Sequence, residues 1–465
     1  MQVEHVWRCH EPGTPPRAAA LRLSHAHVKT QCPYDTARPD LFEAPTAYRL
    51  SFSAAYISCG GRWHTLDRVG SIAMIDLSLP CSVTMGFYIA WVSANCRDGP
   101  VRPSVRGVPR EDEASFESCL HRAVGMLQRP QIDSYFPKVR PAPVPASIRE
   151  PLCSVLIDAE EDFAWMRPVR GEPYDLTCMR HLSDLQTILA AYGAIPTYLL
   201  TYPVLQDEDI VDSLRAMVVR GQCLVGIQLH PWVTPPFTEA PEISNSFVTN
   251  LGPELEEAKL IELMRLFRTC FGEDPTVFRA GRYGLSRHTP SLLAKYGFAI
   301  DTSLAPCTSS ADEQGPDFST DDYRTFWFGD ARPVLEVPLC RSIVGWGGET
   351  AARVYLRLSA APPNRILPGL LARTRCAERI TLSPEGNDAS AVGRLALGLL
   401  RRGQRVLPLS LHSSSLSVGQ NPYVQSRADL HAFYDQLSAI LDMLANRFHV
   451  RFVPSLDLPA LLSDG

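Results

Sequence analysis

Residues 195–231 read IPTYLLTYPVLQDEDIVDSLRAMVVRGQCLVGIQLHP. The first ten residues are rich in β-branched and aromatic side chains, which is typical of a buried strand. Residues 207–221 then repeat apolar positions at helical spacing, begin with acids and stop at Gly221. A second apolar run, 223–231, follows and ends at His230. Strand, helix and strand in this order predict a βαβ unit with parallel strands.

The same alternation continues on both sides, from Pro151 almost to the end of the chain. Strands are predicted at 154–160, 276–281, 298–304, 334–339, 405–415 and 450–456, and helices at 175–193, 252–272, 287–297, 389–403 and 429–447. About seven such units without a glycine-rich dinucleotide fingerprint favour a closed or nearly closed β/α barrel over a doubly wound sheet. The sequence therefore predicts an α/β fold with a barrel over residues 149–460.

Residues 1–148 show weak periodicity and no recognisable motif. They end in a proline-rich stretch, KVRPAPVPASIREP, that is typical of an extended linker. This N-terminal extension has no predicted fold, and the sequence leaves open a disordered segment, an accessory domain or an over-long start of the reading frame.

The composition is that of an ordinary soluble enzyme, with 45% apolar and 20% charged residues and a formal net charge of −5. We expect no nucleic-acid partner, because no dense basic run is present. The thirteen cysteines lack a C-x-x-C pair and fit reduced thiols. The N-terminus lacks a signal-peptide pattern, so a cytoplasmic location is expected. Nothing predicts the oligomeric state.

One uncharged run, LSLPCSVTMGFYIAWVSA at 77–94, has the minimum length of a membrane span. Pro80 interrupts it, and a buried pair of strands explains it equally well. Membrane association is therefore not expected.

Ionisable residues stand at the ends of several predicted strands. Asp158 and Glu160 leave one strand on the same face, and His230, Arg279, Asp301 and His412 end others. The carboxyl ends of barrel strands meet at one mouth, where catalysis is expected, so the pattern predicts an enzyme. Two neighbouring acids suit one metal ligand and one general base. The alternatives are a solvated acidic loop, structural histidines and an arginine that only fixes a loop.

Nucleophilic catalysis is poorly supported, because the chain has no G-x-S-x-G elbow and no cysteine in a recognisable motif. Metal-assisted or acid/base hydrolysis is the better interpretation. Gln228 lies two residues before His230 and shares its strand face.

The chain contains five motifs in this order: LIDAEEDFAW, VGIQLHPWVTPP, VFRAGRYGL, AIDTSLAP and LSLHSSSL. Together they resemble the motifs of the NodB-homology polysaccharide deacetylases, a carbohydrate esterase family 4-like group. Within that family they are most similar to the WalW-type proteins. The resemblance covers residues 151 to about 457. It implies a distorted (β/α)7-type barrel that removes N-acetyl groups from amino sugars of glycans, usually with zinc or another divalent metal.

The resemblance also implies roles for individual residues. Asp158 resembles the general base, Arg279 the arginine that orients it, and His412 the histidine that protonates the leaving amine. Asp301 falls in the fourth motif, with a supporting role. Ala159 stands where most members have a second aspartate, so Glu160 is the substitute metal ligand.

The expected metal site departs from the family pattern, which supplies two histidines in the second motif. Here Gln228 occupies the first position and His230 the second, and an amide oxygen is a weak ligand for zinc. Three alternatives follow for the function of this site. It could bind a weaker or different metal, belong to a metal-independent hydrolase that acts on a small non-sugar amide, or belong to an inactive relative that only binds sugar. Trp165, Trp232, Arg282 and Tyr283 are candidate substrate contacts, although aromatic residues there are as often packing.

Overall fold

The computed structural model describes residues 135–463, with gaps at 163–169, 320–323, 331–332 and 361–365, and five strands within residues 3–75. The chain divides into two compact units, Met1–Glu117 and Ser118–Gly465. Trp165 and the apolar run 77–94 lie outside the described residues.

The described strands of the first unit form an antiparallel sheet in the order β1-β2-β3-β4, with β5 also paired to β3. Their bounds are Val3–Cys9 for β1, Arg17–Thr30 for β2, Ala47–Cys59 for β3, Arg62–Leu66 for β4 and Ile72–Ile75 for β5.

In the described part of the second unit, nine strands form one sheet in the order β17-β8-β9-β10-β11-β12-β14-β13-β6. The seven strands from β17 to β14 run parallel, β13 is antiparallel to β14, and β6 is antiparallel to β13. The bounds are Arg140–Pro141 for β6, Val155–Ala159 for β8, Thr197–Leu200 for β9, Leu224–Leu229 for β10, Val277–Ala280 for β11, Ile300–Asp301 for β12, Phe326–Phe328 for β13, Val334–Glu336 for β14 and Leu409–His412 for β17.

The gap between β14 and β17 is bridged by a hairpin of β15 (Arg341–Val344) and β16 (Glu378–Thr381). Leu382 N donates to Cys340 O at 2.8 Å, and Ser410 N in β17 donates to Leu382 O at 3.1 Å. Because a short hairpin takes the place of a regular strand, the barrel is distorted. The predicted α/β barrel of about seven parallel strands is confirmed.

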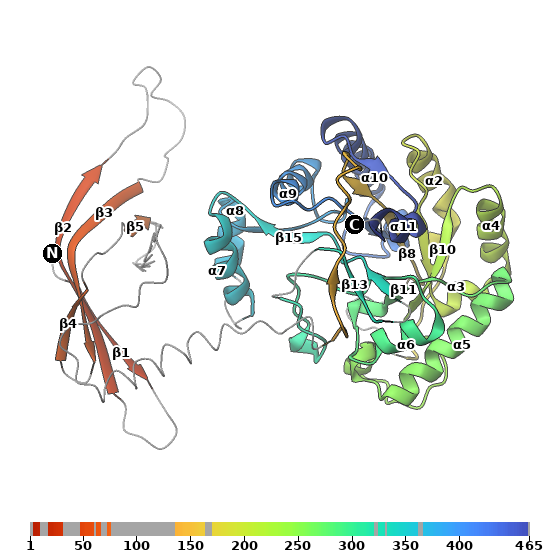
Figure 1. The fold of residues 1–465 in the computed structure, drawn as a ribbon, viewed down its shortest axis with the longest axis horizontal. Helices are drawn as coiled ribbons and strands as arrows, with labels where there is room; N and C mark the ends of the chain where they lie inside the picture. The colour runs from red at the N-terminus through yellow and green to blue at the C-terminus, as the bar shows by residue number, and fades with distance from the viewer. Residues whose placement is uncertain are drawn as a thin grey trace. The chain divides into compact units, whose positions relative to one another are not determined.

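Helices surround the sheet (Figure 1). Asp207 caps α4 by accepting from Ile210 N at 3.0 Å, and Gly272, with φ of 81°, ends α5. The bounds are Leu182–Ala190 for α2, Tyr202–Gln206 for α3, Glu208–Val219 for α4, Pro253–Phe271 for α5, Thr289–Tyr296 for α6, Ala389–Arg401 for α9, Arg427–Asp442 for α10 and Leu458–Ser463 for α11.

Three features differ from the sequence-based expectations. Phe136 is buried in the core and β6 pairs with β13, so the barrel unit begins before residue 149. The predicted last strand forms β18 (Arg451–Phe452), which pairs with β7 (Leu152–Cys153) outside the main sheet. The β15–β16 hairpin carries two helices that the sequence did not reveal, α7 (Gly348–Ala360) and α8 (Ile366–Arg373).

Among the described residues, no helix combines the length and the apolar character that crossing a bilayer requires.

Candidate active site

The carboxyl ends of the parallel strands bring most of the predicted site residues together. His412 in β17 is in register with Asp158 in β8, and Gln228 in β10 is in register with Arg279 in β11. Asp158, Gln228 and Arg279 are buried, and the His412 side chain is 22% exposed. Among these four side chains, solvent therefore reaches the cluster at the imidazole of His412.

Asp158 is held between two positive groups. Its Oδ1 forms a salt bridge with Arg279 Nη1, and its Oδ2 lies 3.2 Å from His412 Nε2. Arg279 Nε donates to Thr302 Oγ1 at 2.8 Å, which fixes the guanidinium plane. The arginine predicted to orient the base thus contacts it directly, through a charge-assisted hydrogen bond.

Glu385 is a member of the site that the sequence did not predict. Its Oε2 lies 2.8 Å from His412 Nδ1, and its Oε1 accepts from His412 N at 2.8 Å and from Ser415 Oγ at 2.6 Å. Glu385 lies in the loop after β16, where no apolar periodicity marks it. Its one signal in the sequence is an acid in a Ser-Pro-Glu-Gly turn just after a short strand.

Three acidic side chains set the charge of His412. Burial disfavours its protonated form, but the negative charges of Glu385, Glu160 and Asp158 raise its pKa to about 10. Burial likewise disfavours the charge of Glu385, and the opposing charge and hydrogen bonds of His412 hold its pKa below the usual value. At neutral pH, His412 is therefore an imidazolium, able to give up a proton.

Glu160, Gln228 and His230 form a second group beside Asp158. Glu160 Oε2 lies 3.4 Å from both His230 Nε2 and Gln228 Nε2. Burial raises the pKa of Glu160 well above its usual value, opposed by His412 and reinforced by Asp158. Glu160 Oε1 and Gln228 Oε1 are buried and have no hydrogen-bond partner among the described residues.

His230 is fixed from three sides. Its Nδ1 lies 2.8 Å from Oε1 of the buried Glu161, and its ring stacks on Trp232 with centroids 4.1 Å apart. Gly281 lies beneath it, because a Cβ at this position would stand 2.5 Å from His230 Cδ2. The bond to Glu161 orients the ring so that Nε2 points to Glu160. Glu161 is thus part of the site rather than a solvated loop acid.

The three predicted metal ligands meet, but they do not fit a zinc ion. Zinc sites use at least three strong donors from His, Cys, Asp or Glu, whereas here Gln228 adds only a neutral amide to Glu160 and His230. Among the described residues, no group of three such side chains has the geometry of a metal site. The zinc implied by the resemblance is therefore not supported by this donor set.

Asp301 is not at the mouth but below it, paired with Glu336 on the adjacent strand β14. Burial raises the pKa of Asp301 to about 6 and that of Glu336 well above its usual value. Asp301 Oδ1 accepts from Ser303 Oγ, which in turn accepts from Ala280 N at 2.8 Å. Asp301 therefore supports the backbone next to Arg279 and does not contact it.

The predicted substrate residues occupy different environments. Trp232 is buried against His230. Arg282 pairs with Glu313 at 2.5 Å and lies over the ring of Phe247, so its charge is used outside the cluster. Tyr283 lies next to the site, with its ring centroid 5.3 Å from the Arg279 guanidinium carbon. Trp165 is not described.

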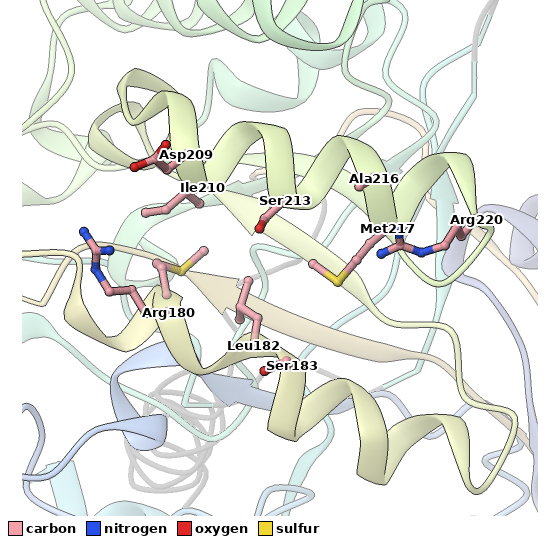
Figure 2. A pocket seen from close by; sticks show the side chains of 10 residues that line it. Arg180, Leu182, Ser183, Asp209, Ile210, Ser213, Ala216, Met217 and Arg220 are labelled. Carbon is pink, nitrogen blue, oxygen red and sulfur yellow. The ribbon is translucent and has the colours of Figure 1, made fainter.

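A separate cavity of about 390 Å³ lies between α4 and the segment that leads into α2 (Figure 2). Met179, Arg180, Met217 and Arg220 are among the residues that line it. None of its lining residues belongs to the cluster around Asp158 and His412. The cavity is a gap between outer helices rather than the mouth of the barrel.

No protein-family profile matches the chain, and no curated protein matches it. Among solved structures, it is similar to a protein from Mycobacterium smegmatis assigned as a polysaccharide deacetylase, with 14% identity, a TM-score of 0.40 and 70% and 96% of the two chains covered. It is also similar to Puue allantoinase, with 14% identity, a TM-score of 0.41 and coverage of 69% and 93%.

A third similar structure is a family 4 acetyl xylan esterase from Clostridium thermocellum in complex with a cobalt ion. It shares 13% identity and a TM-score of 0.32, with 67% of this chain and 91% of that chain covered.

Proposed function

We propose that this chain is a WalW-type member of the polysaccharide deacetylases that hydrolyses N-acetyl groups of amino sugars in a glycan by general acid/base catalysis. One observation carries the proposal. At the solvent-reachable point of a buried ionic cluster, the His412 imidazole is in contact with Asp158 through Nε2 and with Glu385 through Nδ1. A candidate base and a candidate acid thus lie side by side at the solvent-exposed edge of the cluster.

In the proposed reaction, Asp158 removes a proton from a water molecule as the water oxygen bonds to the acetyl carbon. The carbonyl π electrons move to oxygen, and the positive charges of His412 and Arg279 stabilise the resulting oxyanion. His412 Nε2 then gives its proton to the amide nitrogen. The carbon–nitrogen bond breaks, leaving acetic acid and a free amine.

The contact between the two residues also restores the starting state. After hydrolysis Asp158 carries a proton and His412 is neutral. Nε2 and Oδ2 are 3.2 Å apart, so the proton passes from Asp158 to His412 without rearrangement. Glu385 keeps the ring oriented during both transfers through its bonds to Nδ1 and to the His412 backbone.

The test is acetate release from N-acetylated oligosaccharides. Asp158→Asn and His412→Gln are each expected to lower kcat by about 10²–10⁴-fold, the usual contribution of a positioned acid or base. Asp435→Asn, at an exposed position of α10, is the matched control and leaves the rate unchanged. Activity that survives both site variants contradicts the proposed roles.

Among the described residues the strong-donor set that a metal needs is incomplete, and an acid/base pair that acts without a metal also suits a second candidate, a metal-independent hydrolase of a small non-sugar amide. Assaying small amides beside the oligosaccharides separates the candidates. Asp158-dependent release from small amides alone supports the second. Glycan binding without release from any amide indicates an inactive relative.

A further inference from the structure

We propose that residues 345–360 and 366–376, which we call the arm, dock the protein on an anionic lipid surface. The arm comprises α7, α8 and the turns that join them to the β15–β16 hairpin. Figure 1 shows α7 and α8 together at the margin of the barrel unit, beyond the end of β15. This inference concerns a surface away from the ionic cluster and does not rest on the proposed hydrolysis.

The described side chains of the arm contribute almost nothing to the core. None of them belongs to either hydrophobic core cluster, whereas the neighbouring Val344 and Ile380 both do. No described side chain of α7 is buried. A helix in a globular protein normally buries an apolar stripe, whereas α7 contacts only α8 and β15 among the described elements with several contacts and leaves its described side chains at least partly exposed.

Large apolar side chains are exposed on the arm. Trp346 is 74% exposed, Leu370 40% and Val354 36%. The Trp346 indole is also fixed in place, because Nε1 donates to Thr374 O at 2.8 Å. An amphipathic indole held at a surface is suited to the level of lipid headgroups, where tryptophan is enriched.

The charge of the arm selects the partner. Its described residues include four exposed arginines, at positions 353, 357, 373 and 375, against one acid, Glu349. The whole chain carries a net charge of −5, so this basic region stands out from the rest. Arginines beside exposed tryptophan, leucine and valine form the pattern of an interfacial helix that binds anionic lipid.

A second copy of the chain fits this surface less well. A two-fold contact brings the same patch of each subunit together, so the arginines of one arm would face those of the other. Like charges brought together in an interface oppose association. An anionic lipid surface satisfies the same arginines and also accepts the exposed apolar side chains.

The test uses the full chain and co-sedimentation with vesicles. Phosphatidylcholine vesicles containing phosphatidylglycerol are expected to bind the protein, and phosphatidylcholine alone much less. Each arginine near an anionic surface contributes about a five-fold gain in partitioning, so Arg353→Gln with Arg357→Gln lowers it about 30-fold. Arg180→Gln with Arg220→Gln is the matched control, on exposed arginines at the α2–α4 cavity, and leaves partitioning unchanged.

Three results overturn the proposal. One is equal binding of the protein to both kinds of vesicle, and another is an Arg353→Gln/Arg357→Gln variant that binds as well as wild type. The third result is a wild-type dimer in solution that the same two substitutions dissociate. Trp346→Ser provides an independent readout, because it removes apolar contact without changing charge. It is expected to weaken binding to the anionic vesicles, and unchanged binding counts against insertion of the arm. Circular dichroism establishes that each variant is folded.

Discussion

Replacing Gln228 by histidine tests the metal chemistry at a single side chain. The variant adds an imidazole beside Glu160 and His230 and completes three strong donors. We expect Gln228→His to retain one zinc ion per chain after dialysis, measured by elemental analysis, while wild type retains much less. Gln228→Asn keeps an amide and is the control. A full equivalent of zinc in wild type would show that the amide suffices.

Lys259, in α5, is a second residue with a measurable role, because its side chain holds the loop that follows His230. It is fully buried, and its Nζ donates to the carbonyl oxygens of Pro231, Thr234 and Pro236 and pairs with Glu239 at 2.9 Å. Replacing it by methionine leaves these acceptors unsatisfied.

Lys259→Met is therefore expected to lower the free energy of unfolding by about 3–5 kcal/mol, as for a broken buried ion pair. Urea denaturation measures this loss. Lys295→Met is the control, because it removes an exposed ion pair with Glu257 and should change the urea concentration at the unfolding midpoint little. Similar midpoints for both variants would contradict the structural role of Lys259.

Residues at strand ends were predictable because a parallel barrel brings its carboxyl ends to one mouth. Asp158, His230, Arg279 and His412 follow this rule, and the structure brings them together. Glu385 was not predictable, because it enters from a loop whose position depends on tertiary contacts. The same limit applies to Glu161, whose burial depends on its contact with His230 rather than on its own segment.

At the scale of elements, helices with clear caps were predicted close to their observed bounds. The β15–β16 hairpin that carries the arm was missed, because β15 and β16 have four residues each and are too short to show a period. The register of the β15–β16 hairpin places Val344 opposite Glu378.

The arm should be removable without unfolding the barrel. Replacing residues 345–377 by Asn-Gly joins Val344 to Glu378 in a two-residue turn suited to a hairpin. Because the described side chains of the arm lie outside the core clusters, we expect a folded protein whose melting temperature falls by only a few degrees, about 1 kcal/mol or less. Differential scanning calorimetry measures the change. Loss of the cooperative transition would mean that the arm is required for the wall of the barrel.

Across the whole molecule, the fold class followed from alternation of strands and helices, but closure of the barrel did not. Closure depends on hydrogen bonds from Leu382 to Cys340 and from Ser410 to Leu382, which join segments without a periodic pattern. The start of the unit before residue 149 also escaped prediction, because β6 has two residues.

The stability of the whole protein should depend on the charge of His412. Its pKa rises from 6.5 to about 10 on folding. A raised pKa means that the folded state binds the proton more tightly, so this stabilisation is complete below pH 6.5 and is lost as the pH rises through about 10. We expect the difference in unfolding free energy between wild type and His412→Gln to shrink across this window in urea titrations. A constant difference would contradict a charged His412.

The crowding of acids around His412 has a consequence for turnover. Asp158 and Glu385 both contact His412, and Glu160 and Glu161 both contact His230. Amide hydrolysis converts a neutral substrate into an amine that takes up a proton. In a mouth rich in carboxylates, that cation is held more firmly than the neutral substrate it came from. Under the proposed reaction, departure of the amine rather than cleavage of the bond would then limit the rate, and added amino sugar would act as a competitive inhibitor.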